Sequence, residues 1–308
     1  MAQERIQKVL AEQGLCSRRA AEQIIREGRV KVNGHPVTLG DKMDPHQDIL
    51  SVDGQRIYIQ RKREFYYYML NKPRGFVTTT SDELGRKTVM DLMEGVPARV
   101  FPVGRLDRDS EGLLLLTNDG DFANLMMHPS HGVSKLYRVT VRPRATEEQV
   151  VALSQGVELD DGTRTQPAVI NVVTDEPERT VLEMTIREGK NREIRRMCEA
   201  VGLDVIRLRR NAMGAVNLGM LQPGEYRELT KSELNALRAA GIRGVSRPKP
   251  KRPPKSRPAA PLREPSAAPV RQAAAPAHAP PAAPAAAKAR PAAPKSPAAP
   301  AAEPPFLW

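Results

Sequence analysis

The segment 104–120 combines residue types that could act on a substrate with a position next to the protein core. Asp107 stands there between Arg105 and Arg108, and a run of four leucines follows at positions 113–116. A run of that length, bounded by glycine and a turn, predicts a short and fully buried strand. Asp107 is therefore expected in a loop that leads into a core strand, where a rigid scaffold can present a side chain for chemistry. Taken alone, the segment favours a simpler interpretation, in which Asp107 is one of several solvated charges. The rest of the chain favours a functional role for Asp107 instead.

The net charge of the chain is +12 over 308 residues, and most of it lies near the C-terminus. Residues 246–308 hold 11 Lys and Arg against 2 acidic residues, which leaves a net charge of only +3 for residues 1–245. Nucleic-acid binding by the folded part must therefore depend on local clusters of basic residues. The sequence has no apolar run long enough to span a bilayer, no signal-peptide pattern, and two cysteines without metal-ligand spacing. These features predict a protein of the reducing cytoplasm.

Residues 1–62 are predicted to form a small module of two helices followed by a hairpin. Apolar spacing favours a first helix over 5–12, Ser17 is placed to cap a second over 18–27, and Asn33-Gly34 is a strong hairpin signal. The segment resembles the alpha-L RNA-binding motif over about the first 50 residues. The alternative is an ordinary solvated face on a helical pair. The residues that we expect to bind RNA here are Arg5, Lys8, Arg18, Arg19, Arg29 and Lys31.

Residues 64–243 are predicted to form the main domain, of α+β class with a mixed sheet. Alternating or apolar segments predict strands near 65–71, 113–116, 136–142, 168–173, 182–186 and 205–210. Helices between them are expected to be capped by Asp121, Thr146, Asn191 and Thr230, the last in a capping box with Glu233. Strands and helices do not alternate regularly, which argues against a doubly wound parallel sheet.

The C-terminal tail, residues 244–308, is predicted to be disordered. It holds 18 of the 28 prolines among alanine and basic residues, and it has too little apolar area to offset chain entropy. The basic residues of the tail could attract RNA in a salt-sensitive way. The alternative is that the tail is a solubilising linker without a partner.

Several blocks of the main domain occur in an order that resembles the bacterial ribosomal pseudouridine synthases of the RsuA-like family. The resemblance covers about residues 3–243 and includes the N-terminal alpha-L module. The blocks are Leu-Asn-Lys-Pro-Arg-Gly (70–75), Thr-Thr-Ser-Asp (79–82), the segment 104–120, Met-His-Pro-Ser (127–130), Lys-Leu-Tyr-Arg-Val (135–139) and Glu-Gly-Lys-Asn-Arg-Glu-Ile-Arg-Arg-Met (188–197). Two departures are visible: Ser110 stands where the family more often has Thr, and Glu193 stands where Gln is usual.

The resemblance implies an isomerisation in which a uridine in RNA is detached from its sugar, turned and rejoined through a ring carbon. No cofactor or metal is implied, because nothing is oxidised and no group is imported. The family's pattern assigns the nucleophile or base to Asp107 and the stacking platform for the loose uracil to Tyr137. It assigns to Arg195 the cation that keeps the carboxylate ionised when RNA excludes water. An alternative for Tyr137 is a tyrosine that packs in the strand with its hydroxyl satisfied.

Helical geometry independently favours Arg195 over its neighbours. With about 100° per residue, Arg195 lies at the edge of the apolar face of the helix expected after Asn191, whereas Arg192 and Arg196 point away. The alternative is an amphipathic helix with three solvated arginines.

A uridine in folded RNA must be unstacked before Asp107 can reach it, at a cost of a few kcal/mol. Arg105 is the candidate to fill the vacated space, with Lys72 and Arg74 as phosphate contacts. An equally good alternative for Arg105 is a salt bridge to Asp109 or Glu111. His128 and His131 have the spacing of a ligand pair, but no third ligand is suitably placed, so no metal site is expected.

These observations predict a monomeric, cofactor-free pseudouridine synthase that acts on ribosomal RNA or a pre-ribosomal particle and has no membrane partner. The large-subunit RNA is favoured as substrate and the small-subunit RNA comes second. The competing class is a non-enzymatic RNA-binding or ribosome-assembly protein on the same scaffold. A transfer-RNA modifier of the same chemistry is a third possibility.

Overall fold

The computed structural model describes residues 3–60 and 64–245. The prediction of a disordered tail falls outside these residues, apart from positions 244 and 245 at the end of the last helix. Within the described ranges, no helix combines the length and the apolar character needed to cross a bilayer.

The N-terminal residues form two helices, as predicted, and the expected hairpin is part of a four-stranded sheet, with a separate two-stranded sheet beside it in the chain. Ser17 caps the second helix by accepting a hydrogen bond from the Ala20 amide at 3.1 Å. Asn33 and Gly34 both have positive φ, which is the backbone of the expected hairpin turn. The elements are β1 (Glu4–Arg5), α1 (Ile6–Glu12), α2 (Arg18–Arg26), β2 (Val30–Val32), β3 (His35–Pro36), β4 (Lys42–Met43), β5 (Leu50–Val52) and β6 (Gln55–Ile57). Their shared core is formed by apolar side chains of both helices and of the strands.

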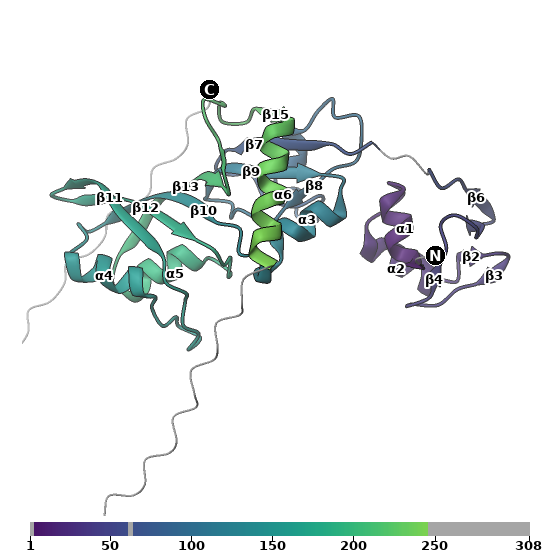
Figure 1. Cartoon of the computed structure of the whole chain (residues 1–308), viewed down its shortest axis with the longest axis horizontal. Coiled ribbons are helices and arrows are strands. Elements are labelled where there is room, and N and C mark those ends of the chain that lie inside the picture. The colour runs from purple at the N-terminus through teal and green to yellow at the C-terminus, as the bar shows by residue number, and fades with distance from the viewer. Residues whose placement is uncertain (1–2, 61–63, 246–308) are drawn as a thin grey trace, which may run out of the picture. The chain divides into compact units, whose positions relative to one another are not determined.

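A nine-stranded mixed sheet organises the rest of the described chain (Figure 1). Its path is β11 (Val169–Glu176), β12 (Arg179–Ile186), β10 (Lys135–Arg142), β13 (Asp204–Met213), β9 (Glu111–Thr117), β7 (Tyr67–Lys72) and β15 (Tyr226–Glu228). Two short strands join it, β8 (Phe101–Val103) on β9 and β14 (Val216–Asn217) on β13. The β13–β9 pair is parallel and the other described pairs of this sheet are antiparallel. The α+β prediction is therefore confirmed.

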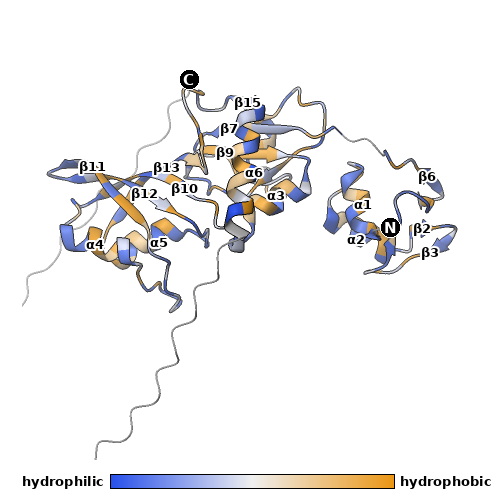
Figure 2. Ribbon diagram, viewed as in Figure 1, coloured by the Kyte–Doolittle hydropathy of each residue, from blue (hydrophilic) through white to orange (hydrophobic). Residues whose placement is uncertain are grey.

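The central strand β9 is buried on both faces, as the four leucines predicted. Leu113 and Leu115 pack in one cluster with side chains of α3 (Gly120–Met127) and α6 (Lys231–Val245). Leu114 and Leu116 belong to a second cluster that includes residues of α4 (Glu147–Gln155) and α5 (Glu193–Ala200). The hydropathy colouring shows apolar segments along β9 and α3 (Figure 2). Burial of each leucine stabilises the fold by about 1.5–3 kcal/mol, which makes β9 a firm base for the loop before it.

Local capping signals predicted two of the four helix starts in this domain. Thr146 caps α4 as expected and forms a capping box with Gln149. Thr230 forms the expected capping box with Glu233. Asp121 was the wrong cap for α3, because Asp119 accepts the bonds from the first turn. Asn191 was also wrong, since α5 begins at Glu193 after Arg192 in the left-handed region. Two 3₁₀ turns, η1 (Val89–Leu92) and η2 (Pro129–His131), complete the domain.

Candidate active site

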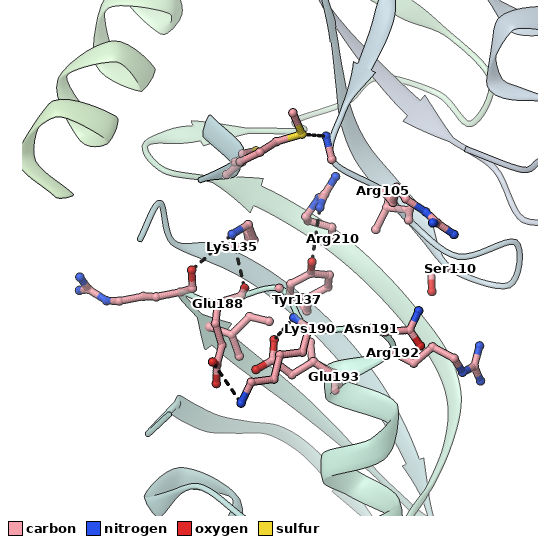
Figure 3. A pocket seen from close by; sticks show the side chains of 18 of the residues that line it. Arg105, Ser110, Lys135, Tyr137, Glu188, Lys190, Asn191, Arg192, Glu193 and Arg210 are labelled. Carbon is pink, nitrogen blue, oxygen red and sulfur yellow. Dashed lines mark hydrogen bonds and ion pairs between the residues drawn. The ribbon is translucent and has the colours of Figure 1, made fainter. Parts of the chain in front are cut away.

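A cavity of about 630 Å³ opens where the loop before β9 meets β10, β13 and the segment that leads into α5. This volume is typical of sites that hold a small ligand. Asp107, Tyr137, Arg192 and Arg210 line it together with Arg105, and Figure 3 shows several of these side chains around the opening. The structure thus brings together two of the three predicted catalytic residues, Asp107 and Tyr137.

The loop that carries Asp107 is fixed by the end of β7 and by the segment that follows it. Lys72 is fully buried, and its ammonium donates to the carbonyl oxygens of Asp107 at 3.0 Å and Ser110 at 2.8 Å. Thr78 donates to the Leu106 carbonyl at 2.6 Å, one residue before the acid. The side chain of Asp107 is 26% exposed, so its carboxylate faces the cavity from a rigid backbone.

The interpretation of Lys72 as a phosphate contact was wrong. Its side chain has no exposed surface, and a third bond to the Pro73 carbonyl at 3.1 Å occupies its remaining donor. Burial lowers the pKa of Lys72 to about 8, although Asp107 and other nearby carboxylates oppose that shift. Arg74 is exposed, and it also donates to backbone carbonyls, those of Asp109 at 3.1 Å and Ile206 at 2.6 Å.

The arginine that pairs with Asp107 is Arg192, at 3.8 Å between Nη1 and Oδ2. Arg195 instead lies 3.8 Å from the carboxylate of Asp109 and donates to the Val205 carbonyl at 3.0 Å. The expectation that Arg192 points away was wrong because Arg192 precedes the helix, with φ of 47°, so helical spacing does not apply to it. Arg196 does point away, toward Asp160 and Asp161.

Arg195 nevertheless stays within the electrostatic reach of the acid. Its side chain is only 12% exposed. Burial lowers the pKa of Arg195, and Asp109 and Asp107 oppose that shift while Arg192 and Arg74 add to it. Arg192 and Arg195 together place two positive charges on the Asp107–Asp109 segment.

Tyr137 lies on β10 with its hydroxyl 3.4 Å from Nη1 of Arg210, on the neighbouring strand β13. Tyr137 is 8% exposed and still lines the cavity, so it is both packed in the strand and available to a ligand. The sequence analysis did not single out Arg210. The available signal was its position two residues after the buried Leu208, which puts a charge on the buried face of β13.

A second group forms the wall beside Tyr137, and the sequence analysis noted its Glu193 only as a departure from the family's Gln. Glu193 is 4% exposed, and the amide of Lys190 donates to its carboxylate at 3.1 Å. Burial and the neighbouring Glu188 raise the pKa of Glu193 well above its usual range. Lys135 donates to the carbonyl oxygens of Arg187 and Glu188, each at 3.4 Å (Figure 3).

Arg105 is exposed at the edge of the cavity, and among the described residues it has no carboxylate partner. The alternative partners are occupied elsewhere, Glu111 by Arg207 at 2.6 Å and Asp109 by Arg192 and Arg195. The salt-bridge alternative for Arg105 is therefore wrong, and its side chain is available to a ligand.

The two histidines near the cavity have ordinary partners. His128 Nδ1 lies 2.7 Å from the Ser130 hydroxyl, and His131 Nδ1 lies 2.8 Å from the Leu125 carbonyl. In residues 3–60 and 64–245, no three His, Cys, Asp or Glu side chains are grouped to hold a metal ion.

The predicted RNA-binding residues of the N-terminal module differ in how they are paired. Lys8 contacts Glu4 at 3.2 Å and Glu12 at 3.5 Å, and Arg29 contacts Glu27 at 3.0 Å and Asp53 at 2.7 Å. The predicted residues that are exposed without such ion pairs among the described side chains are Arg5, Arg18, Arg19 and Lys31.

A carboxylate on a fixed loop, a tyrosine face and several cations around one cavity suit covalent or proton-transfer chemistry on a planar base. Comparison with known proteins agrees with this geometry. Residues 66–200 match the RNA pseudouridylate synthase family, and residues 4–49 match the S4 domain. The chain is 43% identical over 244 residues to the ribosomal large subunit pseudouridine synthase B of Bacillus subtilis, covering 98% of that protein and 78% of this chain.

The chain belongs to the RNA pseudouridylate synthase family.

Two further relatives agree with this assignment. The synthase is 45% identical over 250 residues to an RNA pseudouridine synthase of Aquifex aeolicus, covering 99% of that protein and 80% of this chain. A crystal structure of a pseudouridylate synthase superimposes with a TM-score of 0.56 at 33% identity, covering 99% of that chain and 76% of this one. The protein is therefore a pseudouridine synthase with an N-terminal S4 domain, as the sequence predicted.

Proposed function

We propose that this synthase converts a uridine of large-subunit ribosomal RNA to pseudouridine in the cytoplasm, acting as a monomer without a cofactor. The name of the Bacillus subtilis relative supports the choice of subunit. We propose domain limits of 1–62 for RNA capture, 64–243 for catalysis and 244–308 for a tail that adds nonspecific affinity. Small-subunit RNA is the second candidate substrate.

The observation that carries the proposal is the position of Asp107 on the rim of a cavity that also presents the ring of Tyr137. Asp107 acts on the nucleoside, either by bonding to the sugar carbon C1′ or by accepting a proton from C2′. Tyr137 stacks on the uracil while it is detached from the sugar. Arg195, with Arg192 beside it, stabilises the Asp107 carboxylate as RNA closes the cavity.

Arg105 is proposed to enter the stack when the target uridine is flipped out. It is exposed and has no ion-pair partner among the described residues, so occupying the vacated space breaks no ion pair of the free protein. Arg74 and the exposed arginines of the S4 domain are proposed to contact phosphate.

The test compares ribosomal RNA from cells with and without this protein by carbodiimide labelling and primer extension. Isomerisation leaves the mass unchanged, so a chemical label is needed. The proposal expects one stop in large-subunit RNA that disappears without the protein and returns when the purified protein is added to an unmodified transcript. A stop confined to small-subunit or transfer RNA would overturn the choice of substrate. Binding to RNA without any stop would favour the non-enzymatic class instead.

A further inference from the structure

A buried arginine on β13, Arg210, forms part of the cavity wall and has no role in the function proposed so far. Its side chain is 3% exposed. Nε donates to the Leu113 carbonyl at 2.7 Å. Nη1 donates to the Tyr137 hydroxyl at 3.4 Å, the bond drawn in Figure 3. These two bonds fix the guanidinium against β9 on one side and β10 on the other.

The backbone of Arg210 is held as firmly as its side chain. Gly112 of β9 pairs with Arg210 in parallel register and has φ of +106°. A Cβ at Gly112 would lie 2.3 Å from the Arg210 carbonyl oxygen, so only glycine lets the two strands come this close. Arg210 is thereby placed relative to the loop that carries Asp107, five residues before Gly112.

One nitrogen of this fixed group lacks an acceptor. Nη2 of Arg210 is buried, and none of the described residues accepts a hydrogen bond from it. Arg210 also has no carboxylate partner among them, and the half-buried Lys135 is a second cation in the same wall. A buried cationic donor without an acceptor is unfavourable, unless a ligand in the cavity supplies one.

The reaction produces such a ligand. When the N1–C1′ bond breaks, its electron pair stays on the base. Asp107 becomes neutral, either because its oxygen bonds to C1′ or because it accepts the C2′ proton. In both routes the negative charge moves from Asp107 to the uracil, where N1, O2 and O4 share it. Formation of the C5–C1′ bond returns the charge to Asp107, and the C5 proton then moves to N1, so no atom is gained or lost.

We propose that Arg210 binds the detached uracil, with Nη2 donating to one of its carbonyl oxygens and the guanidinium charge stabilising the anionic base. The proposal rests on the role given to Asp107 above. Fixed donors aimed at charge that develops during a reaction are among the largest sources of rate enhancement. Arg210 also orients Tyr137 through its hydroxyl, so one residue positions the stacking ring and holds the edge of the base.

The experiment varies the stability of the anionic base. Fluorine at C5 withdraws electrons and stabilises the detached base without help from the protein. Single-turnover rates are measured for the wild type, Arg210→Gln and Arg210→Lys on RNA with uridine or 5-fluorouridine at the target. The readout is loss of the target nucleoside after digestion and separation, because a C5 that carries fluorine has no proton to pass to N1. Arg209→Gln is the matched control, because it removes the same charge from the other face of β13.

We expect Arg210→Gln to lower the rate on uridine RNA by about 10²–10³-fold, the loss typical for removal of one such donor. The loss on 5-fluorouridine RNA should be at least about tenfold smaller, with the Kd for RNA within about threefold of the wild type. Arg210→Lys keeps the charge, so its rate on uridine RNA should lie between those of the wild type and Arg210→Gln. Arg209→Gln should change each rate and the Kd by less than about threefold.

Equal losses on the two RNAs would mean that Arg210 only supports the structure, and a change in Kd alone would make it an RNA contact; either result overturns the proposal. If Arg210→Gln does not fold, Arg210→Lys is tested in its place, and its loss of rate is compared between the uridine and the 5-fluorouridine RNA. A wild type that leaves uridine RNA unchanged contradicts the proposed function itself, which separates that failure from the failure of the Arg210 proposal.

Discussion

The guanidinium of Arg192 lies 3.8 Å from the carboxylate of Asp107 and 3.7 Å from that of Asp109. Arg192 reaches both because it precedes α5 with a left-handed backbone, which turns its side chain toward the loop before β9. The side chain is 45% exposed, whereas that of Arg195 on the same segment is 12% exposed. Solvent therefore screens the charge of Arg192 more than that of Arg195.

Asp107→Asn should fold normally and form no detectable pseudouridine. The amide keeps the size of the side chain, and it removes the charge needed for attack on the sugar or for proton transfer. Asp109→Asn is the matched control, two residues away and exposed, and should lose less than about tenfold in turnover because exposed ion pairs contribute little. The measurement is carbodiimide labelling of a defined transcript. Product formed by Asp107→Asn at the wild-type rate would remove Asp107 from the mechanism.

Replacing each arginine singly should separate the two charges near Asp107. Arg195→Ala should lower single-turnover rates by about 100-fold or more with little change in RNA affinity, because its charge acts through protein rather than water. Arg192→Ala should lower them by less than about tenfold, since its exposed pair is screened. Rates and Kd are measured on the same transcript. An equal fall of turnover and affinity in Arg195→Ala would make it a phosphate contact instead.

The features that could be predicted from the sequence are those set by neighbours in the chain. Leu113 to Leu116 form a short apolar run bounded by a glycine and a turn, and Thr146 caps the helix that follows it directly in the chain. Lys72 was misassigned because its three acceptors include carbonyls that lie 35 and 38 residues further along the chain. Arg210 was overlooked for the same reason, since its contacts to Leu113 and Tyr137 arise only when β9, β13 and β10 pair. Long-range contacts of this kind decide whether a basic residue meets RNA or supports the site.

Lys72→Met should destabilise the synthase by about 1–3 kcal/mol, because it leaves backbone carbonyls buried without a donor. Turnover should fall further than RNA affinity, since two of those carbonyls belong to the loop that holds Asp107. Urea denaturation gives the free energy of unfolding. Lys231→Met, at an exposed lysine on α6, is the control and should change stability by less than about 0.5 kcal/mol. Unchanged stability of Lys72→Met would show that the bonds to the Asp107 and Ser110 carbonyls are not needed to hold the loop.

Glu193→Gln should stabilise the protein at alkaline pH and have little effect near pH 5. The pKa of Glu193 is raised in the folded chain by burial and by Glu188. Between the ordinary glutamate pKa of about 4.3 and the raised value, the folded state holds a proton that the unfolded state releases. Stability contributed by this group is thus complete at low pH and is lost as the pH rises through that window. Glutamine stays neutral and removes the loss.

The check on Glu193 is thermal unfolding of the wild type, Glu193→Gln and Glu199→Gln at about pH 5 and 8.5. Glu199 lies on the same helix and is exposed, so its replacement controls for the change in net charge. The Tm difference between Glu193→Gln and the wild type should grow with pH, and that of Glu199→Gln should not. A constant difference would contradict the raised pKa.

The S4 domain should bind RNA through the arginines that carry no internal ion pair. Replacing both Arg18 and Arg19 with Ala should weaken RNA binding and reduce the slope of log K against log salt by about 1–2, the number of phosphate contacts removed. Arg29→Ala should change the slope by less than about 0.5, because Asp53 and Glu27 already neutralise Arg29. Filter binding at several salt concentrations measures both, and turnover at saturating RNA should stay near the wild-type value. A larger change for Arg29→Ala than for the double variant would place the RNA contact on the hairpin side of the domain rather than at the start of α2.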